Sequence, residues 1–312
     1  MELVFTDREE AFRQEVREFL KRELPSDWEG FDDGDEYEGE GWEFTRSLAR
    51  KLAEKRWLTL SWPKEYGGKE MSGIYDFILT EALSRWGAPQ AGKGVGIVGK
   101  TIIRHGSEKM KRYFLPKIIN AEIEFAIGYS EPNAGSDAAS MQLRAERDQE
   151  RGGGVLNGHK IWTSWAKWAT HCFVLARTGT TEDRHRGLSG FVIETNAPGV
   201  TVGPIRQSNG SDELAEVFLD QAFVPDEALV GEEGQGWAVA RYIPSGERGS
   251  YTWLRQSEML PRLEQLARVE GASEHAAILG ESLMRLIALR CRSREVMEIL
   301  AAGEETGPES SV

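Results

Sequence analysis

The chain has 312 residues, 40% of them hydrophobic, which is enough for one large domain or a few small ones. Its formal net charge of −13 argues against a nucleic-acid binder, because such proteins draw their affinity largely from Lys and Arg side chains on phosphates. The sequence has no apolar run of about 18 residues and no metal-ligand spacing among its five histidines, so we expect no membrane span and no metal site.

The first third of the chain predicts helices. Thr6-x-x-Glu9 is a capping box, which marks a helix start. The apolar face of that helix consists of Phe12, Val16, Phe19 and Leu20. Residues 29–40 form an acidic loop, and a turn cluster over 62–68 interrupts the helical pattern. Further helices are predicted over residues 42–55, 73–85, 94–105 and 108–119.

Between about residues 121 and 231 short β-rich runs alternate with Gly, Pro and Asn. The predicted strands cover residues 154–162, 171–176, 190–194, 200–202 and 215–219. Turn residues at such regular intervals between short strands are typical of a compact sheet domain.

From residue 236 the helical period returns and predicts two long helices, over 237–266 and 274–300. The first could break at Pro244 or Pro261. The order of helices, strands and helices indicates an α+β fold with separate layers. Two helices leave apolar faces open, so we expect either a truncated chain or an oligomer in which another subunit completes the bundle.

Two glycine-containing stretches raise the question of a nucleotide site. Gly94-x-Gly96-x-x-Gly99 has the letters of the dinucleotide fingerprint but lies among predicted helices without a preceding strand, so we reject it. In the stretch IGYSEPNAGSD at 127–137, a short strand runs into a Pro-Asn turn and a Gly-Ser pair. Backbone N–H groups and Ser136 could hold a phosphate there, and a plain β-turn is an equal alternative.

Three tryptophans, Trp162, Trp165 and Trp168, crowd the stretch WTSWAKW directly after the turn residues NGHK. Such indoles could form a wall against a flat group, or they could belong to an ordinary sheet core.

Six short motifs follow one another along nearly the whole chain. They are WPKEYGG at 62–68, FLPKI at 114–118, SEPNAGSD at 130–137, NGHKIWTS at 157–164, VP at 224–225 and GEEGQGW at 231–237. In these motifs the chain resembles the acyl-CoA dehydrogenase family of flavoproteins. The resemblance implies an N-terminal helical domain at residues 1–121, a central β-barrel at 122–235, and a C-terminal helical bundle at 236–312 that lacks its last helices.

The resemblance also implies FAD as the cofactor. The residues that match positions beside the flavin ring are Ile127, Tyr129, Ser130, Trp162 and Ser164. Gly135 and Ser136 match positions that meet the FAD pyrophosphate and the acyl-CoA. Trp165 and Trp168 match no such position, and we expect them to pack in the core or on the surface.

The reaction implied by the resemblance is α,β-dehydrogenation of an acyl-CoA thioester, in which a carboxylate takes the α-proton and flavin N5 takes the β-hydride. A minority of the family carries that carboxylate on the first bundle helix, which here reads IPSGERG at 243–249. Glu247 matches that position and is the expected base, with Arg248 as a substrate contact. A plain ion pair of Glu247 with a nearby cation is the alternative.

One departure concerns partners. Many members carry Arg-x-x-Phe-Gly after the first bundle helix, and this chain reads LARVEGAS at 266–273. It therefore lacks a residue set that reaches a neighbouring subunit's FAD, and a different, related subunit could supply it. The resemblance implies an electron-transferring flavoprotein as electron acceptor. An oxidase that uses oxygen and a non-catalytic subunit of a heteromer are the alternatives.

The expected location is the cytoplasm. Cys172 and Cys291 stand alone rather than in a C-x-x-C pair, which fits a reducing compartment and buried thiols. The first residues, MELVFTDREE, have no apolar core, so no signal peptide is expected.

Overall fold

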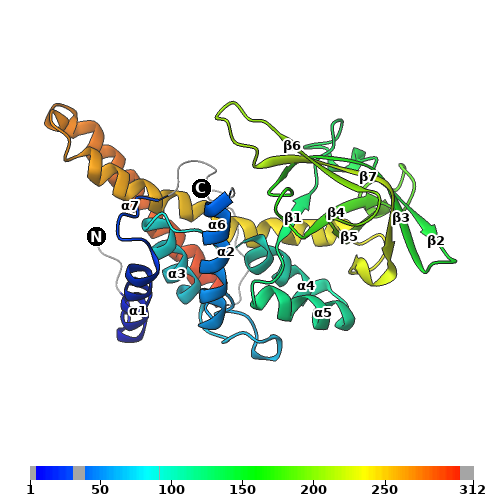
Figure 1. The fold of residues 1–312 in the computed structure, drawn as a ribbon, viewed down its shortest axis with the longest axis horizontal. Helices are drawn as coiled ribbons and strands as arrows, with labels where there is room; N and C mark the ends of the chain where they lie inside the picture. Colours follow the sequence, from blue (N-terminus) through cyan, green and yellow to red (C-terminus); the bar gives the residue numbers. More distant parts are fainter. Residues whose placement is uncertain (1–4, 31–38, 91, 303–312) are drawn as a thin grey trace. The chain divides into compact units, whose positions relative to one another are not determined.

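The computed structural model describes residues 5–30, 39–90 and 92–302, and over 244–256, 297, 300 and 301 it describes the backbone alone. Its elements are labelled in Figure 1. Internal contacts divide the chain into two units. The first consists of Met1–Asp32, Ser47–Gln90 and Ser245–Val312, and the second of Asp33–Arg46 and Ala91–Pro244.

The first unit is helical. Its helices are α1 (Asp7–Glu23), the second half of α2 (Gly39–Glu54), η2 (Lys64–Tyr66), α3 (Gly73–Arg85), α6 (Gly236–Leu266) from Ser245 onward, η7 (Ala272–His275) and α7 (Ala276–Ala301). Helix α3 packs against both α1 and α7. A partly buried ion pair, Arg290 Nη2 to Glu81 Oε2 at 2.9 Å, joins α7 to α3.

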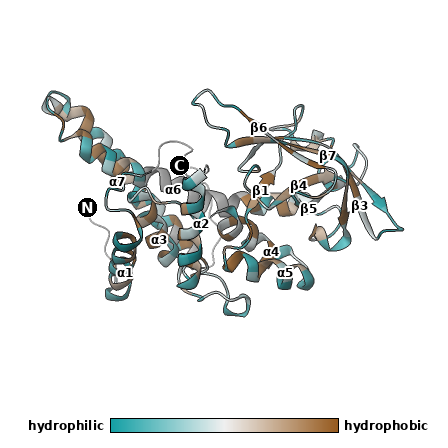
Figure 2. Cartoon of the chain, viewed as in Figure 1, coloured by the Kyte–Doolittle hydropathy of each residue, from teal (hydrophilic) through white to brown (hydrophobic). Residues whose placement is uncertain are grey.

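Helix α1 forms as its sequence predicts. The Thr6 hydroxyl accepts a hydrogen bond from the Glu9 N–H at 3.3 Å, and the Thr6 N–H donates to Glu9 Oε2 at 2.7 Å, which completes the capping box. The buried face consists of Phe12, Val16, Phe19 and Leu20, while the rest of the helix is hydrophilic (Figure 2). The rings of Phe12 and Phe19 pack edge-on against Trp57, with ring centroids 5.3 and 5.2 Å away.

The break that the two prolines could introduce into the first long C-terminal helix does not occur. Helix α6 runs without interruption through Pro244 and Pro261. A proline inside a helix removes one backbone hydrogen bond, and in α6 this local cost does not end the helix.

The second unit combines the first half of α2, the helices η3 (Gly94–Val98), α4 (Gly99–His105) and α5 (Glu108–Ile119), one sheet, and the start of α6. The strands are β1 (Phe125–Gly128), β2 (Arg144–Asp148), β3 (Gly153–Ser164), β4 (His171–Arg177), β5 (Leu188–Glu194), β6 (Val200–Ile205), β7 (Leu214–Pro225) and β8 (Leu229–Val230). Their order is β6-β7-β3-β2-β4-β5-β8, and β1 pairs parallel to β4.

The α+β order of helices, a central sheet domain and helices is confirmed, but the expected barrel is not closed. Strand β6 pairs with β7 and β8 pairs with β5, and among the described residues no hydrogen-bonded pairing joins these two ends. The sheet is therefore an open ladder. The boundaries predicted for three domains, 1–121, 122–235 and 236–312, remain a prediction.

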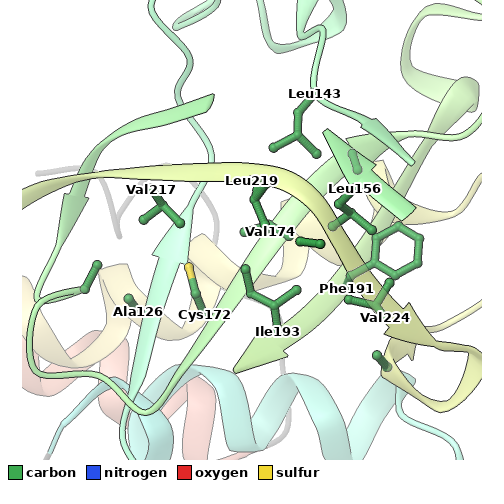
Figure 3. Close-up of a cluster of buried hydrophobic side chains, with 14 of the residues drawn as sticks. Ala126, Leu143, Leu156, Cys172, Val174, Phe191, Ile193, Val217, Leu219 and Val224 are labelled. Carbon is green, nitrogen blue, oxygen red and sulfur yellow. The ribbon is translucent and has the colours of Figure 1, made fainter. Parts of the chain in front are cut away.

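The core of the second unit lies on one face of this sheet (Figure 3). Its larger members include Leu143, Leu156, Val174, Phe191, Ile193, Val217, Leu219 and Val224. On β7 the buried positions change phase at a bulge where Gln221 has a left-handed φ of 53°, which keeps Leu219 and Ala222 both on the core side.

Only one of the two cysteines is fully buried. Cys172 has no exposed surface, and burial raises the pKa of its thiol to about 12. Cys291 is half-buried on α7, so the expectation of two buried thiols holds for Cys172 alone. Among the described helices, none combines the length and the apolar run that crossing a bilayer requires.

Candidate active site

Strand β3 contains a bulge that sets the direction of Trp162. The register against β7 shifts between Lys160 and Thr163. Inside this bulge Trp162 has a left-handed φ of 59°, and the residue is 56% exposed. Residues with a Cβ rarely adopt that φ, and the strain persists only where the surrounding structure imposes it. The bulge therefore turns a large flat side chain out of the sheet, where it can cover a planar ligand.

Ser164 ends β3 beside the bulge and is half-buried. Its carbonyl accepts a hydrogen bond from Lys93 Nζ at 3.4 Å, and the same ammonium lies 4.4 Å from the centroid of the Trp165 ring. The Trp168 ring lies 6.4 Å from that of Trp42. Both Trp165 and Trp168 thus pack within the chain, whereas Trp162 is exposed.

The exit of strand β1 lies next to the same bulge. The Ile161 N–H donates to the Ser130 carbonyl at 2.9 Å, which ties the residue before Trp162 to the segment after β1. Ile127, Tyr129 and Ser130 are each partly exposed. The structure therefore brings these three predicted positions together with the end of β3.

The turn after β1 presents the Gly-Ser pair. Glu131 and Ala134 exchange two backbone hydrogen bonds, of 2.8 and 3.1 Å, and Gly135 and Ser136 follow on the exposed side. The φ of Gly135 is not left-handed, and a Cβ built there would meet no described atom within 4 Å. Neither backbone conformation nor a neighbouring atom therefore explains why glycine stands at position 135. The lack of a side chain there would allow a ligand to approach the backbone closely.

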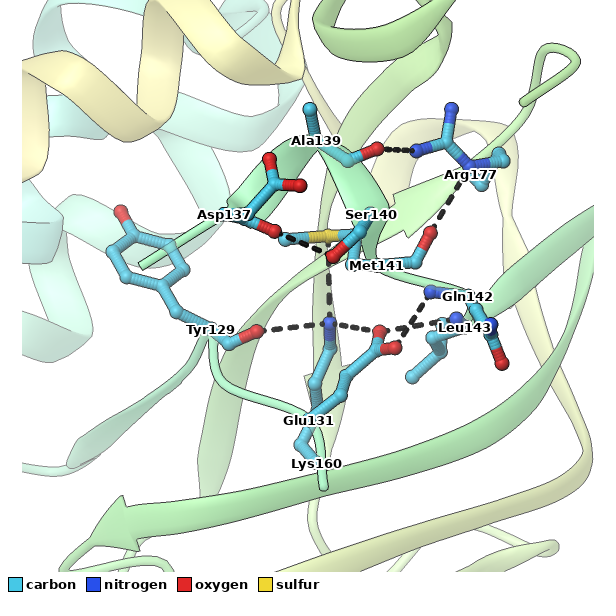
Figure 4. Close-up of polar contacts among 10 residues, drawn as sticks. All are labelled: Tyr129, Glu131, Asp137, Ala139, Ser140, Met141, Gln142, Leu143, Lys160 and Arg177. Atoms are coloured by element: carbon cyan, nitrogen blue, oxygen red, sulfur yellow. Dashed lines mark hydrogen bonds and ion pairs between the residues drawn. The ribbon is translucent and has the colours of Figure 1, made fainter. Parts of the chain in front are cut away.

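Beneath this turn lie two buried charges that the sequence motifs contained but to which we assigned no role (Figure 4). Lys160 has no exposed side-chain surface, and Glu131 is 8% exposed. Lys160 Nζ lies 2.8 Å from Glu131 Oε1 and 3.2 Å from the Tyr129 carbonyl. Burial lowers the pKa of Lys160, and the Glu131 carboxylate opposes that shift. The sequence NGHKIWTS around Lys160 mixes polar and apolar residues and gave no signal for this pair.

The expected base and substrate contact, Glu247 and Arg248, lie in helix α6 and in the first unit. Their side chains are outside the described part of the structure, so their roles remain predictions. The expected flavin contacts, at positions 127–136 and 162–164, all lie in the second unit.

Two protein-family models match consecutive parts of the chain. The acyl-CoA dehydrogenase N-terminal domain matches residues 6–122, and the acyl-CoA dehydrogenase middle domain matches residues 126–222. The chain is also 35% identical over 314 residues to acyl-CoA dehydrogenase IpdE1 of Mycolicibacterium smegmatis, an alignment that covers 95% of this chain and 80% of the relative. The chain belongs to the acyl-CoA dehydrogenase family.

Two solved structures have a similar fold. A structure named Tcur3481-Tcur3483 steroid ACAD is similar with a TM-score of 0.87 and 30% identity, and the match covers 99% of this chain and 80% of that one. The ChsE4-ChsE5 complex from Mycobacterium tuberculosis is similar with a TM-score of 0.83 and 28% identity, over 100% of this chain and 81% of that one. The family match confirms the resemblance inferred from the sequence. It also confirms the enzyme class, because acyl-CoA dehydrogenases are oxidoreductases. The family is FAD-dependent.

The exposed and half-buried residues around the bulge of β3 and the turn after β1 fit a flavin dinucleotide chemically. The Trp162 indole offers a flat apolar face, and the hydroxyls of Ser130, Ser136 and Ser164 offer donors on the segments around it. The accessible backbone at Gly135 offers close approach to a phosphate.

Proposed function

We propose that this chain catalyses FAD-dependent α,β-dehydrogenation of an acyl-CoA thioester to the trans-2-enoyl-CoA. The observation that carries the proposal is the exposed Trp162 on the bulge of β3, in a chain of the acyl-CoA dehydrogenase family. The bulge is hydrogen-bonded, from Ile161 to Ser130, to the segment that leads to the exposed Gly135–Ser136 pair. A strained, exposed tryptophan is costly for the isolated chain, which supports a role in binding.

In this proposal three groups of residues hold the cofactor. Ile127, Tyr129 and Ser130 line its pyrimidine side. Trp162 covers the ring, and the Ser164 hydroxyl donates near N5. Gly135 and Ser136 meet the pyrophosphate, and Ser136 also meets the acyl-CoA. When bound, FAD supplies the acceptor for the β-hydride.

Glu247 is the proposed general base. Its carboxylate takes the α-proton of the thioester, and to do so it must be shielded from water, so that its pKa rises toward that of the acidified α-carbon. Arg248, its neighbour in α6, is proposed to contact the substrate. The partial negative charge on the thioester oxygen needs hydrogen-bond donors in the closed site.

We further propose that electrons pass on to an electron-transferring flavoprotein, and that the enzyme works as an oligomer. A second candidate is a partner-dependent subunit of a heteromer, because two similar structures carry the names of two proteins each. The name of the first also includes a steroid, which supports testing steroid-derived acyl-CoA esters as substrates.

The visible spectrum of the purified chain, before and after anaerobic addition of acyl-CoA esters, tests the proposal. We expect a yellow protein whose flavin absorbance bleaches with at least one straight-chain or steroid-derived ester. A yellow protein that no ester bleaches would count against dehydrogenation by this chain alone. A colourless protein that becomes yellow only with a co-expressed related subunit would favour the second candidate.

Trp162→Leu should weaken FAD binding about tenfold, on the order of 1.4 kcal/mol, because leucine keeps apolar contact but loses stacking on the ring. Titration of FAD-free protein with FAD, followed by flavin fluorescence, measures the effect. Tyr113→Leu is the matched control, since Tyr113 is a 48% exposed aromatic residue on α5. Equal affinities for the two variants would remove Trp162 from the cofactor site.

A further inference from the structure

The segment between Tyr129 and Leu143, called the cofactor turn below, is held by hydrogen bonds from buried charged side chains as well as by apolar packing (Figure 4). Lys160 is hydrogen-bonded to its first half and Arg177 to its second half. The side chain of Lys160 has no exposed surface, and Arg177 is 2% exposed. Buried charges are costly, and an apolar replacement of a buried pair is often no less stable, so stability alone does not explain them.

Lys160 and Glu131 join the two ends of the turn. Lys160 Nζ donates to the Tyr129 carbonyl at 3.2 Å and to Glu131 Oε1 at 2.8 Å. The same carboxylate accepts the Gln142 N–H at 2.6 Å and the Leu143 N–H at 3.0 Å. The entry and exit of the turn are therefore tied to one ion pair, whose lysine lies two residues before Trp162.

Arg177, at the end of β4, holds the second half of the turn. Its Nη2 donates to the Ala139 carbonyl at 2.6 Å and its Nε to the Met141 carbonyl at 3.0 Å. Nη1 donates to the carbonyls of Thr180 and Arg184, at 2.9 and 3.1 Å. These four hydrogen bonds all go to backbone carbonyls, and the nearby Asp183 carboxylate also interacts electrostatically with this guanidinium.

Gly135 and Ser136 are exposed between these two anchors. We propose that Lys160, Glu131 and Arg177 are positioning residues that fix the cofactor turn in its binding geometry before the dinucleotide arrives. The proposal rests on the proposed function, because it assigns the turn to the pyrophosphate. A preformed turn binds more tightly because no ordering cost is left for the binding step.

The test measures FAD affinity and apoprotein stability separately, in the purified full chain. The double variant Lys160→Met/Glu131→Gln removes both charges together, so no buried charge is left unpaired. We expect the Kd for FAD to rise at least tenfold, while the Tm of the apoprotein stays within a few degrees of wild type. A merely structural pair would move the Tm and leave the Kd unchanged, and a Kd within twofold of wild type would overturn the proposal.

Arg177→Lys is a second variant that does not depend on the folding of the first. It keeps the positive charge but loses the fork that reaches several carbonyls, so we expect the Kd for FAD to rise about fivefold. Arg144→Lys is the matched control, because Arg144 on β2 also donates to a carbonyl, of Gly179 at 2.9 Å, but is exposed. Equal Kd values for Arg177→Lys and the control would overturn the proposal. Wild-type protein that binds no FAD would instead refute the proposed function, before any variant is compared.

Discussion

Glu247→Gln should slow the reduction of bound flavin by acyl-CoA about 10²–10⁴-fold, the range for loss of a general base. Glutamine has nearly the same shape but cannot take the α-proton. Because the lost interaction belongs to the transition state, FAD binding and acyl-CoA binding should remain near wild type. Stopped-flow absorbance under anaerobic conditions measures the rate, and the visible spectrum reports the bound cofactor.

Glu264→Gln is the control for this experiment, since Glu264 is an exposed glutamate on the same helix, 3.4 Å from Arg85. Its flavin should be reduced at the wild-type rate. If Glu247→Gln is also reduced at that rate, Glu247 is not the base. A protein that loses FAD in the Glu247 variant would point to a structural role of this residue.

Lys160→Met should destabilise the fold by about 3–5 kcal/mol, the range for removing one partner of a buried ion pair. Methionine fills similar space, but Glu131 is then left buried without its cation. We expect the urea midpoint of the FAD-free protein to fall sharply. Intrinsic tryptophan fluorescence follows the transition, because tryptophans lie in both units.

The stability of Lys160→Met is compared with that of a surface-pair control and with that of a double variant. Lys109→Met removes an exposed lysine that pairs with Glu227, and exposed pairs contribute only about 0–1 kcal/mol, so this variant should unfold as wild type does. Adding Glu131→Gln to Lys160→Met should restore most of the lost stability. If the single variant is as stable as wild type, the buried pair carries no energetic coupling.

Elements with strong local signals were predicted to within a few residues. The helices at Gly73–Arg85 and Glu108–Ile119 match their predictions, because serine caps, apolar period and turn residues all lie within the element itself. Strand β2 was missed because its sequence, RAERD, has no apolar alternation and buries only Ala145. It is held instead by its antiparallel pairing with β3.

The site residues also divide into those that local sequence motifs predicted and those that depend on long-range contacts. The motifs placed Trp162, Ser164 and the Gly135–Ser136 pair in the site, and the structure brings the segments that carry them together. The motifs also contained Lys160 and Glu131, but the sequence gave no indication that these two side chains form an ion pair. That contact depends on the pairing of β3 with its neighbours and on the path of the chain after β1.

The sequence by itself determined the order of the layers, the ends of the capped helices and the family, because these depend on spacing along the chain. Only the tertiary structure decided that the sheet stays open, that a bulge turns Trp162 outward, and that Lys160 and Arg177 are hydrogen-bonded to the cofactor turn. These features arise from strand register and from burial, which depend on residues far apart in the sequence.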